Sequence, residues 1–482
     1  MDSKILLFAL AFLTSIFTYG QSRVWRVDVE GASFFSSPRA IDLNNDGILD
    51  IVIGGGVENN PSKNGVIAID GNSGDVLWTV KSRTQIYTSA LFQDINGDTI
   101  PDVFIGGRAA NYFAIDGSNG ELLWEFFEGG QNESRKAGFL NFFGTQFIHD
   151  IDNDGFKDLL VTNGGDYLAD STVKDRPTAR LMVLSSKTGK ILKSARMPDN
   201  KESYYAPHII GISGKEHVVF GTGGETIGGS IFIAPLEEFL EEGSLQNANA
   251  IVSDSLKGFI LNSVSTDLNN DGQADIVCAG MNGELFAIDV LTKNKIWSKK
   301  FSSRECYVTP SLGHFNADDT PDVFAILAKG TFPQYSMFEI LVVDGETGDV
   351  ILRRERGFNQ FSPAAVINFD KDEVDEIVYL ENKVVDPSTY SIENKLCIYD
   401  VEQTKATFLG PQRQGMSMAS APLVVDLGGN GDFEVVVCSS TIPKKEGQLP
   451  KGTIECITLP KSVSSVRWPG YLGPNENGKL DN

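Results

Sequence analysis

Short apolar runs alternate with turn residues and polar loops along almost the whole chain. Typical runs are Ile51-Val52-Ile53, Val66 to Ile69 and Ile276-Val277-Cys278, each preceded by Gly or Asp and followed within two residues by Gly or Asp. Such runs are typical of β-strands, because branched side chains suit a pleated surface and turn residues end it. Helical periodicity is confined to Pro235 to Leu245, where we expect one short helix.

A nine-residue acidic pattern recurs between these runs and divides the chain into repeats. The four full copies are DLNNDGILD (42–50), DINGDTIPD (94–102), DIDNDGFKD (150–158) and DLNNDGQAD (267–275). Eroded copies begin at residues 314, 368 and 426, and a copy that has lost the acidic pattern begins at residue 211. The repeat starts are about 55 residues apart on average, which is close to the length of a propeller blade.

These repeats predict an all-β fold, a β-propeller of eight four-stranded blades, with seven blades as the alternative. Residues 21–482 would form this single domain, since any cut would open the ring. Val24-Trp25-Arg26-Val27 is placed like the last strand of a blade, as Leu77 to Val80 is before the next acidic loop. We expect it to pair with the C-terminal unit, because closure removes exposed strand edges.

The acidic loops have the chemistry of calcium sites. In the pattern DxNxDGxxD, side-chain oxygens at positions 1, 3, 5 and 9 can converge on a hard cation, and the glycine at position 6 allows the sharp turn. An EF-hand is excluded, because position 12 is apolar and lies on a strand. An Asx-rich turn would explain one copy, whereas four copies at blade spacing favour a cation. The predicted ligands are Asp42, Asn44, Asp46, Asp50, Asp94, Asn96, Asp98, Asp102, Asp150, Asp152, Asp154, Asp158, Asp267, Asn269, Asp271, Asp275, Asn368, Asp370, Asp372 and Glu376.

The net charge and the N-terminal residues limit the possible ligands and the cellular location of the protein. The net charge of −23 excludes a protein that tracks nucleic-acid phosphates. Lys4 precedes the apolar run Ile5 to Phe17, which predicts a signal peptide over residues 1–20 and a secreted or periplasmic protein. No apolar segment is long enough for a transmembrane helix. The first cysteine is Cys278, so we expect no lipid-modified cysteine after the signal peptide.

Five cysteines are too few, and odd in number, for a disulfide framework. Cys456 stands where other repeats have alanine on a strand, which favours a buried thiol. A disulfide between Cys438 and Cys456 is the alternative.

Two families resemble these repeats. The acidic loops followed by apolar strands resemble the FG-GAP or VCBS-type repeats of integrin-α-like propellers, which implies calcium in the loops. AIDGNSGDVLW (68–78) and AIDGSNGELLW (114–124) are similar to the tryptophan-docking motif of quinoprotein (PQQ-like) eight-bladed propellers. The unit Ala287 to Trp297 departs from that motif with Lys293 at the glycine position, and the chain has no adjacent cysteine pair. These departures favour the members of that scaffold family that bind no cofactor.

Two functions fit this sequence. The four histidines have no catalytic motif around them, which favours a non-catalytic module for binding, adhesion or protein interaction. The alternative is an exported enzyme on the same scaffold, either a quinoprotein dehydrogenase or a polysaccharide lyase.

The expected ligand is a glycan or a protein, bound on the face opposite the calcium loops. Loops between strands 1 and 2 and between strands 3 and 4 of a blade share one face, so the other connections form the opposite face. Candidate recognition residues on those connections are Arg83, Arg108, Tyr112, Arg135, Phe142, Tyr167, Arg176, Tyr204, Tyr205, Arg304, Tyr307, Arg354 and Phe358.

Overall fold

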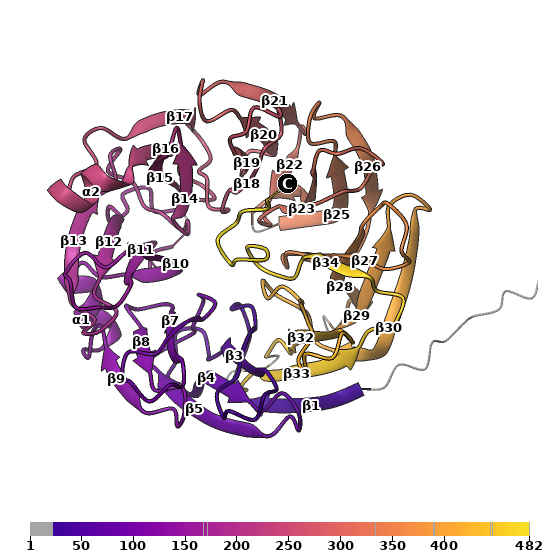
Figure 1. Cartoon of the computed structure of the whole chain (residues 1–482), viewed down its shortest axis with the longest axis horizontal. Helices are drawn as coiled ribbons and strands as arrows, with labels where there is room; N and C mark the ends of the chain where they lie inside the picture. Colours follow the sequence, from indigo (N-terminus) through magenta and orange to yellow (C-terminus); the bar gives the residue numbers. More distant parts are fainter. Residues whose placement is uncertain are drawn as a thin grey trace, which may run out of the picture.

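The fold is a ring of eight antiparallel sheets around a central axis (Figure 1). The computed structural model describes residues 23–166, 168–170, 172–332, 334–388, 391–443, 445 and 447–481. The predicted signal peptide and Tyr167 therefore lie outside the described residues. The prediction of an eight-bladed propeller is confirmed, and the seven-bladed alternative is wrong.

The first four blades each have four strands, and the first strand of each lies nearest the axis. Blade 1 holds β2 (Arg39–Ile41), β3 (Asp50–Gly54), β4 (Ser62–Ile69) and β5 (Val76–Ser82). Blade 2 holds β6 (Leu91–Gln93), β7 (Asp102–Gly106), β8 (Tyr112–Ile115) and β9 (Leu122–Glu125). Blade 3 holds β10 (Asn141–Ile148), β11 (Asp158–Gly164), β12 (Arg180–Leu184) and β13 (Ile191–Arg196). Blade 4 holds β14 (His208–Ile212), β15 (Lys215–Gly221), β16 (Gly229–Pro235) and β17 (Asn249–Asp254).

Of the remaining blades, blades 5 and 8 also have four strands, whereas blades 6 and 7 have a fifth strand. Blade 5 holds β18 (Val264–Thr266), β19 (Asp275–Gly280), β20 (Glu284–Ile288) and β21 (Lys295–Lys300). Blade 6 holds β24 (Asp322–Thr331), β25 (Gln334–Val343) and β26 (Val350–Glu355), with both β22 (Arg304–Cys306) and β23 (Ser311–Gly313) paired to β24. Blade 7 holds β27 (Ala365–Asn368), β28 (Glu376–Asp386), β29 (Ser391–Asp400) and β30 (Lys405–Gln414). Blade 8 holds β31 (Leu423–Val425), β32 (Glu434–Ser440) and β33 (Lys451–Thr458).

The N-terminal strand β1 (Arg23–Glu30) completes blade 8 and closes the ring. It runs antiparallel to β33, with Arg26 opposite Glu455 and Val27 opposite Ile454. This confirms the predicted closing strand. The strand is held on the outer edge of the blade by a segment more than 400 residues away in sequence, so the two ends of the chain seal the ring together.

Two short helices lie between strands. Helix α2 (Leu236–Glu242) follows β16 and buries Leu236, Phe239 and Leu240, as the sequence predicts. Helix α1 (Gln131–Ala137), between β9 and β10, was not predicted; it ends at Gly138, whose positive φ of 81° suits a residue without a Cβ. Within the described ranges, no helix is both long and apolar enough to span a membrane.

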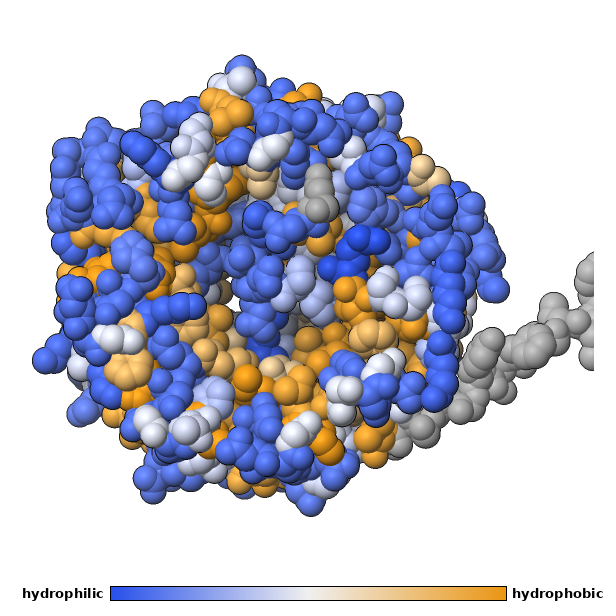
Figure 2. Space-filling model, in the orientation of Figure 1, coloured by the Kyte–Doolittle hydropathy of each residue, from blue (hydrophilic) through white to orange (hydrophobic). Residues whose placement is uncertain are grey.

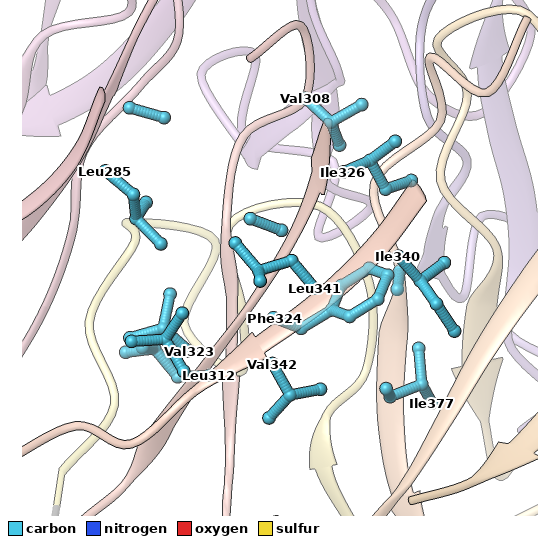
Figure 3. Packing of buried hydrophobic residues seen from close by; sticks show 14 of the residues in the cluster. Leu285, Val308, Leu312, Val323, Phe324, Ile326, Ile340, Leu341, Val342 and Ile377 are labelled. Carbon is cyan, nitrogen blue, oxygen red and sulfur yellow. The ribbon is translucent and has the colours of Figure 1, made fainter. Parts of the chain in front are cut away.

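The core lies between neighbouring blades rather than inside one blade. The second strands, such as β3 and β7, are buried along their whole length, whereas the outer strand β5 alternates buried and exposed positions. Figure 3 shows buried side chains of one cluster that come from successive blades, among them Leu285, Phe324 and Ile377. Seen from the face in Figure 2, the ring is hollowed at its middle.

Tryptophans on four of the outer strands connect their blades to the next blade. Trp78 of blade 1 donates its indole N–H to the Gly117 carbonyl of blade 2 at 2.8 Å. Its ring lies against Gly120, where a Cβ would come within 2.7 Å of the Trp78 Cγ. The same contact joins Trp25 to Gly74, Trp124 to Gly189 and Trp297 to Gly348.

The contact between tryptophan and glycine explains why one copy of the docking motif lacks its glycine. Blade 5 has Lys293 at that position, and the last strand of blade 4, β17 (NAIVSD), has no tryptophan to place over it. The glycine is therefore needed only where the preceding blade supplies an indole ring.

We expect Trp78→Ala to lower the free energy of unfolding by about 3 to 5 kcal/mol, because it removes a buried aromatic ring between two blades. Urea denaturation of the purified protein measures this. The matched control is Lys293→Gly, at the hairpin position without a docking ring, which should cost less than about 1 kcal/mol. A loss below about 1 kcal/mol for Trp78→Ala would show that the indole does not hold the blades together.

Candidate functional site

The acidic loops lie on one face of the ring, and their ninth residue faces the protein interior. The Asp50 carboxylate accepts the Leu43 N–H at 2.9 Å and the Gly71 N–H at 3.0 Å, which joins the loop to the hairpin between β4 and β5. Burial raises the pKa of this carboxyl to about 6. It also raises the pKa values of Asp102 and Asp158 to about 6, of Asp275 to about 7 and of Glu376 to about 8.

The side chains of the other predicted ligands accept hydrogen bonds from backbone N–H groups of their own loop. The Asp42 carboxylate accepts the Gly47 N–H at 3.0 Å, and Asn44 and Asp46 each accept the N–H two residues further on. Gly47 has a φ of +85°, so a residue with a Cβ would be strained there. Equivalent positions are exposed in the other loops: Asn96, Asp98, Asp152, Asp154, Asn269, Asp271, Asp370 and Asp372.

Three of the loops gather carboxylates closely enough to hold a metal ion. Each group offers three ligand atoms within 4.8 Å of one another; the groups are Asp150, Asp152 and Asp158, then Asp318, Asp322 and Asp344, then Asp370, Glu376 and Asp400. Asp318, Asp322, Asp344 and Asp400 are missing from the predicted ligand sets; Asp344 and Asp400 come from the ends of the third strands. The structure thus brings together part of the predicted ligands and adds an acid from the neighbouring hairpin.

A cavity of about 600 Å³ lies in the channel, toward the face opposite these loops. All eight blades contribute to its wall at one repeat position, seven residues before each repeat start. These residues are Phe35, Tyr87, Phe143, Tyr204, Ile260, Tyr307, Phe361 and Ala419. We call this set the channel belt. Because the first strand of every blade lines the axis, the same position in each repeat reaches the same height in the channel.

The belt is largely aromatic, and its rings touch one another. The ring centroids of Phe35 and Tyr87 are 5.5 Å apart, those of Tyr87 and Phe143 are 5.5 Å apart and stacked, and those of Phe143 and Tyr204 are 5.0 Å apart. On the far side of Ile260, Tyr307 lies 5.0 Å from Phe361. Two aromatic arcs therefore face each other across the cavity.

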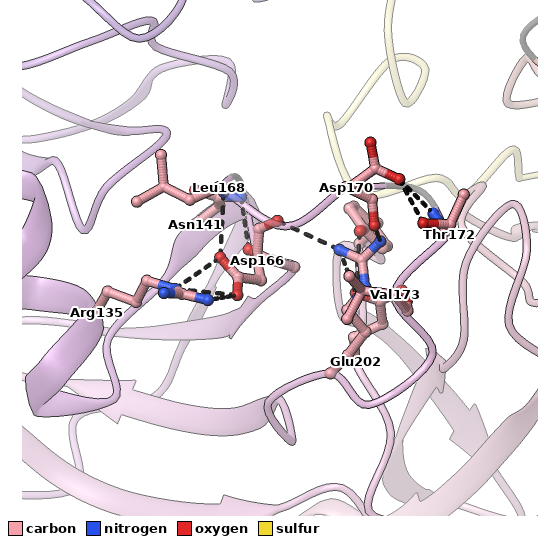
Figure 4. Close-up of polar contacts among 11 residues, drawn as sticks. Arg135, Asn141, Asp166, Leu168, Asp170, Thr172, Val173 and Glu202 are labelled. Atoms are coloured by element: carbon pink, nitrogen blue, oxygen red, sulfur yellow. Dashed lines mark hydrogen bonds and ion pairs between the residues drawn. The ribbon is translucent and has the colours of Figure 1, made fainter.

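Charged side chains stand above the belt, mostly as pairs. Arg108 contacts Glu58 at 2.7 Å and lies over the Tyr87 ring. Arg135 holds the buried Asp166 through both carboxylate oxygens, as Figure 4 shows.

Arg176, on the loop between β11 and β12, is also held by contacts within the protein. The guanidinium of Arg176 donates to the carbonyls of Val173 and Asp170, both at 2.9 Å, and reaches Glu202 at 3.9 Å. Most charges around the cavity are thus already compensated.

The C-terminal segment forms the floor of the cavity. After β34 (Ser465–Trp468), which pairs with β27 on the inner side of blade 7, the chain enters the middle of the ring (Figure 1). Tyr471 lines the cavity and its hydroxyl contacts Asn262. Further along, Glu476 pairs with Arg39 at 3.1 Å, and the Asn477 carbonyl accepts the Gln146 amide at 3.0 Å.

A family model for the FAM234A/B β-propeller matches residues 89–371, more than half of the chain. The chain belongs to this propeller family. No curated protein sequence matches it.

Solved structures of the same fold include a quinohemoprotein alcohol dehydrogenase from Comamonas testosteroni (12% identity, TM-score 0.53, covering 92% of this chain and 77% of that one). A europium-containing methanol dehydrogenase has 11% identity and a TM-score of 0.54 over 91% of this chain and 93% of that one. Sqt1 from Saccharomyces cerevisiae has 9% identity and a TM-score of 0.52 over 91% and 100%. At these identities the likeness concerns the fold alone.

In this FAM234A/B-type propeller, some of the predicted recognition residues line the cavity and others belong to the hydrophobic core. Those that line the cavity are Arg108, Arg176, Tyr204 and Tyr307; those that belong to the core are Tyr112, Phe142 and Tyr205. Sequence reasoning missed the rest of the channel belt, although its fixed spacing before each repeat start could have shown it. The five cysteines are free and buried, so the Cys438–Cys456 disulfide does not form here.

His208 connects the floor to blade 4. It is fully buried on β14, with Nδ1 2.8 Å from the Ser263 hydroxyl and Nε2 3.1 Å from the Ser265 hydroxyl. The Ser265 N–H in turn donates to the Gly478 carbonyl of the floor at 2.8 Å. Burial lowers the pKa of His208 to about 4, so the imidazole is neutral at pH 7.

Acid should weaken this part of the ring. The unfolded chain takes up a proton on His208 below about pH 6.5 whereas the folded chain resists until about pH 4, so stability present above pH 6.5 is lost as the pH falls. Between pH 7 and 4.5 we expect wild type to lose about 2 to 3 kcal/mol more unfolding free energy than His208→Gln, which does not titrate. Urea denaturation at both pH values measures the difference, and equal losses would contradict it.

Proposed function

We propose that this protein is an exported, non-catalytic binding propeller that holds its ligand in the channel cavity and binds calcium on the opposite face. The observation that carries the proposal is the channel belt, where one position of every repeat converges on a single cavity. Sequence repeats that only built the scaffold would not need aromatic residues at six of those eight positions.

The cavity has the character of a ligand site. Its volume of about 600 Å³ lies within the range of small-molecule sites, which combine apolar walls with a few oriented polar groups. Aromatic faces such as Tyr87 and Phe143 offer flat apolar platforms, and Ser37 and Asn262 add hydrogen-bonding groups at the wall. A glycan or the protruding end of a protein ligand could fill this space.

The cavity does not suit an anionic quinone cofactor. Such a group would need cationic side chains to meet its carboxylates. The two arginines of the wall, Arg108 and Arg176, already face Glu58 and Glu202. We therefore derive no redox step through this cavity.

Calcium suits the acidic loops because their ligands are hard oxygens on flexible turns. The carboxylate groups around Asp150 and Asp370 each lie close enough to share an ion. Their mutual repulsion is relieved when a divalent cation binds. The cation would thereby stabilise the face of the ring that the cavity does not use.

We expect calcium to raise the melting temperature after treatment with a chelator. At free calcium about ten times Kd, each loaded site stabilises the fold by about 1.4 kcal/mol. Equilibrium dialysis should show one ion fewer in Asp152→Asn and in Asp370→Asn. The matched control is Glu216→Gln, in the repeat whose loop has lost the acidic pattern. An unchanged ion count in both loop variants would contradict calcium binding at these loops.

Binding should depend on the channel belt. A glycan array and a peptide display library would identify ligands of the wild-type protein. For such ligands, Tyr87→Ala and Phe361→Ala should each weaken binding by about ten- to a hundredfold, since each removes an aromatic platform. The control is Phe408→Ala, an aromatic residue exposed on the outer strand β30, which should leave affinity unchanged. Ligands that bind all three variants like wild type would place the site elsewhere.

A further inference from the structure

Glu225 differs from the other carboxylates of the cavity. It lies on the turn between β15 and β16 and lines the cavity half-buried. Glu58 and Asp166 each pair with an arginine, but within the described ranges no basic side chain pairs with Glu225. Among the side chains that the structure describes, only the Tyr307 hydroxyl hydrogen-bonds to it, donating at 2.9 Å.

The neighbouring basic residues are already engaged. Lys174, on the adjacent loop, donates its ammonium to the Thr226 carbonyl at 2.6 Å, and Lys257 pairs with Glu305 at 2.8 Å. Arg176 is held by backbone carbonyls and faces Glu202. One negative charge of the cavity wall is thus left without a partner from the protein.

The groups around Glu225 are aromatic. Tyr307 stacks on Phe332, with ring centroids 6.0 Å apart, and lies against Phe361. Tyr204, which leads into the first strand of the blade that carries Glu225, donates its hydroxyl to Glu202 at 3.1 Å. Burial, followed by the nearby carboxylates, raises the pKa of both tyrosines well above the usual value. Both side chains therefore stay neutral, and both line the cavity.

A carboxylate that has a hydrogen bond from a tyrosine but no basic partner, and that lies beside aromatic rings, is complementary to a cation. A half-buried carboxylate is costly unless an opposite charge compensates it. Cations are attracted to the faces of tyrosine and phenylalanine within about 6 Å of the ring centroid, most strongly when the site excludes water. A neutral ligand would leave the charge of Glu225 uncompensated, so the wall favours a positively charged one.

We propose that the cavity recognises an organic cation, a protonated amine or a quaternary ammonium group, which sits against Tyr204 and Tyr307 with Glu225 as its counter-charge. This inference rests on the proposed binding function and names the chemistry of the ligand. The other belt residues would contact the uncharged part of the same molecule.

The test compares cations with neutral molecules of the same shape. Isothermal titration calorimetry would measure binding of choline against 3,3-dimethyl-1-butanol, and of n-butylammonium against n-butanol, at low ionic strength. We expect each cation to bind at least tenfold more tightly than its neutral counterpart. Raising the salt concentration should weaken only the cations.

Two variants locate the effect. Glu225→Gln keeps the shape of the side chain and should reduce cation affinity at least tenfold while leaving the neutral molecules unaffected. Glu237→Gln, the same change at an exposed position of α2 in the same blade, should alter neither. Circular dichroism and the melting temperature would show that both variants are folded.

The outcomes separate this inference from the proposed function. Equal binding of cations and neutral molecules, unchanged cation affinity in Glu225→Gln, or no binding of either cation at 10 mM would overturn the inference. If a neutral glycan then bound in a manner that Tyr87→Ala abolished, the cavity would remain a ligand site. If the array and peptide screens also gave no ligand that depends on the belt, both proposals would fail.

Discussion

Closure of the ring is the constraint on which the rest of the structure depends. β1 pairs with β33 and fixes eight first strands around one axis. The same strand supplies Trp25, whose indole N–H bonds to the Gly71 carbonyl of blade 1 at 2.7 Å, so closure also provides the first inter-blade lock. Without closure of the ring, the eight residues of the channel belt would not be held around one cavity. The cavity is therefore a property of the whole ring and of no single blade.

The first strands of all blades run in the same direction along the channel, so the two faces of the ring carry different residue types. In a blade the chain runs from the channel belt through the first strand to the loop that follows it, as from Phe35 through β2 to the acidic loop at Asp42 in blade 1. Aromatic residues are thus placed at one end of the channel and carboxylates at the other. The floor lies in the middle of the ring and is tied to Arg39 and Gln146 on first strands. A ligand on one face and cations on the other could bind without competing for space.

The sequence predicted what its repeats encode and missed what depends on contacts between repeats. Blade number, the closing strand and α2 follow from periodicity and were predicted. The floor was not, because residues after Trp468 carry no repeat. Asp344 and Asp400 were not, because the pairing of the third strand with the second brings them to the acidic loops. Six of the eight residues of the channel belt were not predicted, because its members share a spacing and not a residue type.

The most direct test of this account is an electron-density map of the protein crystallised with calcium and with a ligand that binds it in solution. The account predicts ligand density inside the channel, against Tyr204 and Tyr307, and ion density at the acidic loops on the opposite face. Ligand density on the outer strands, with only water in the channel, would contradict it.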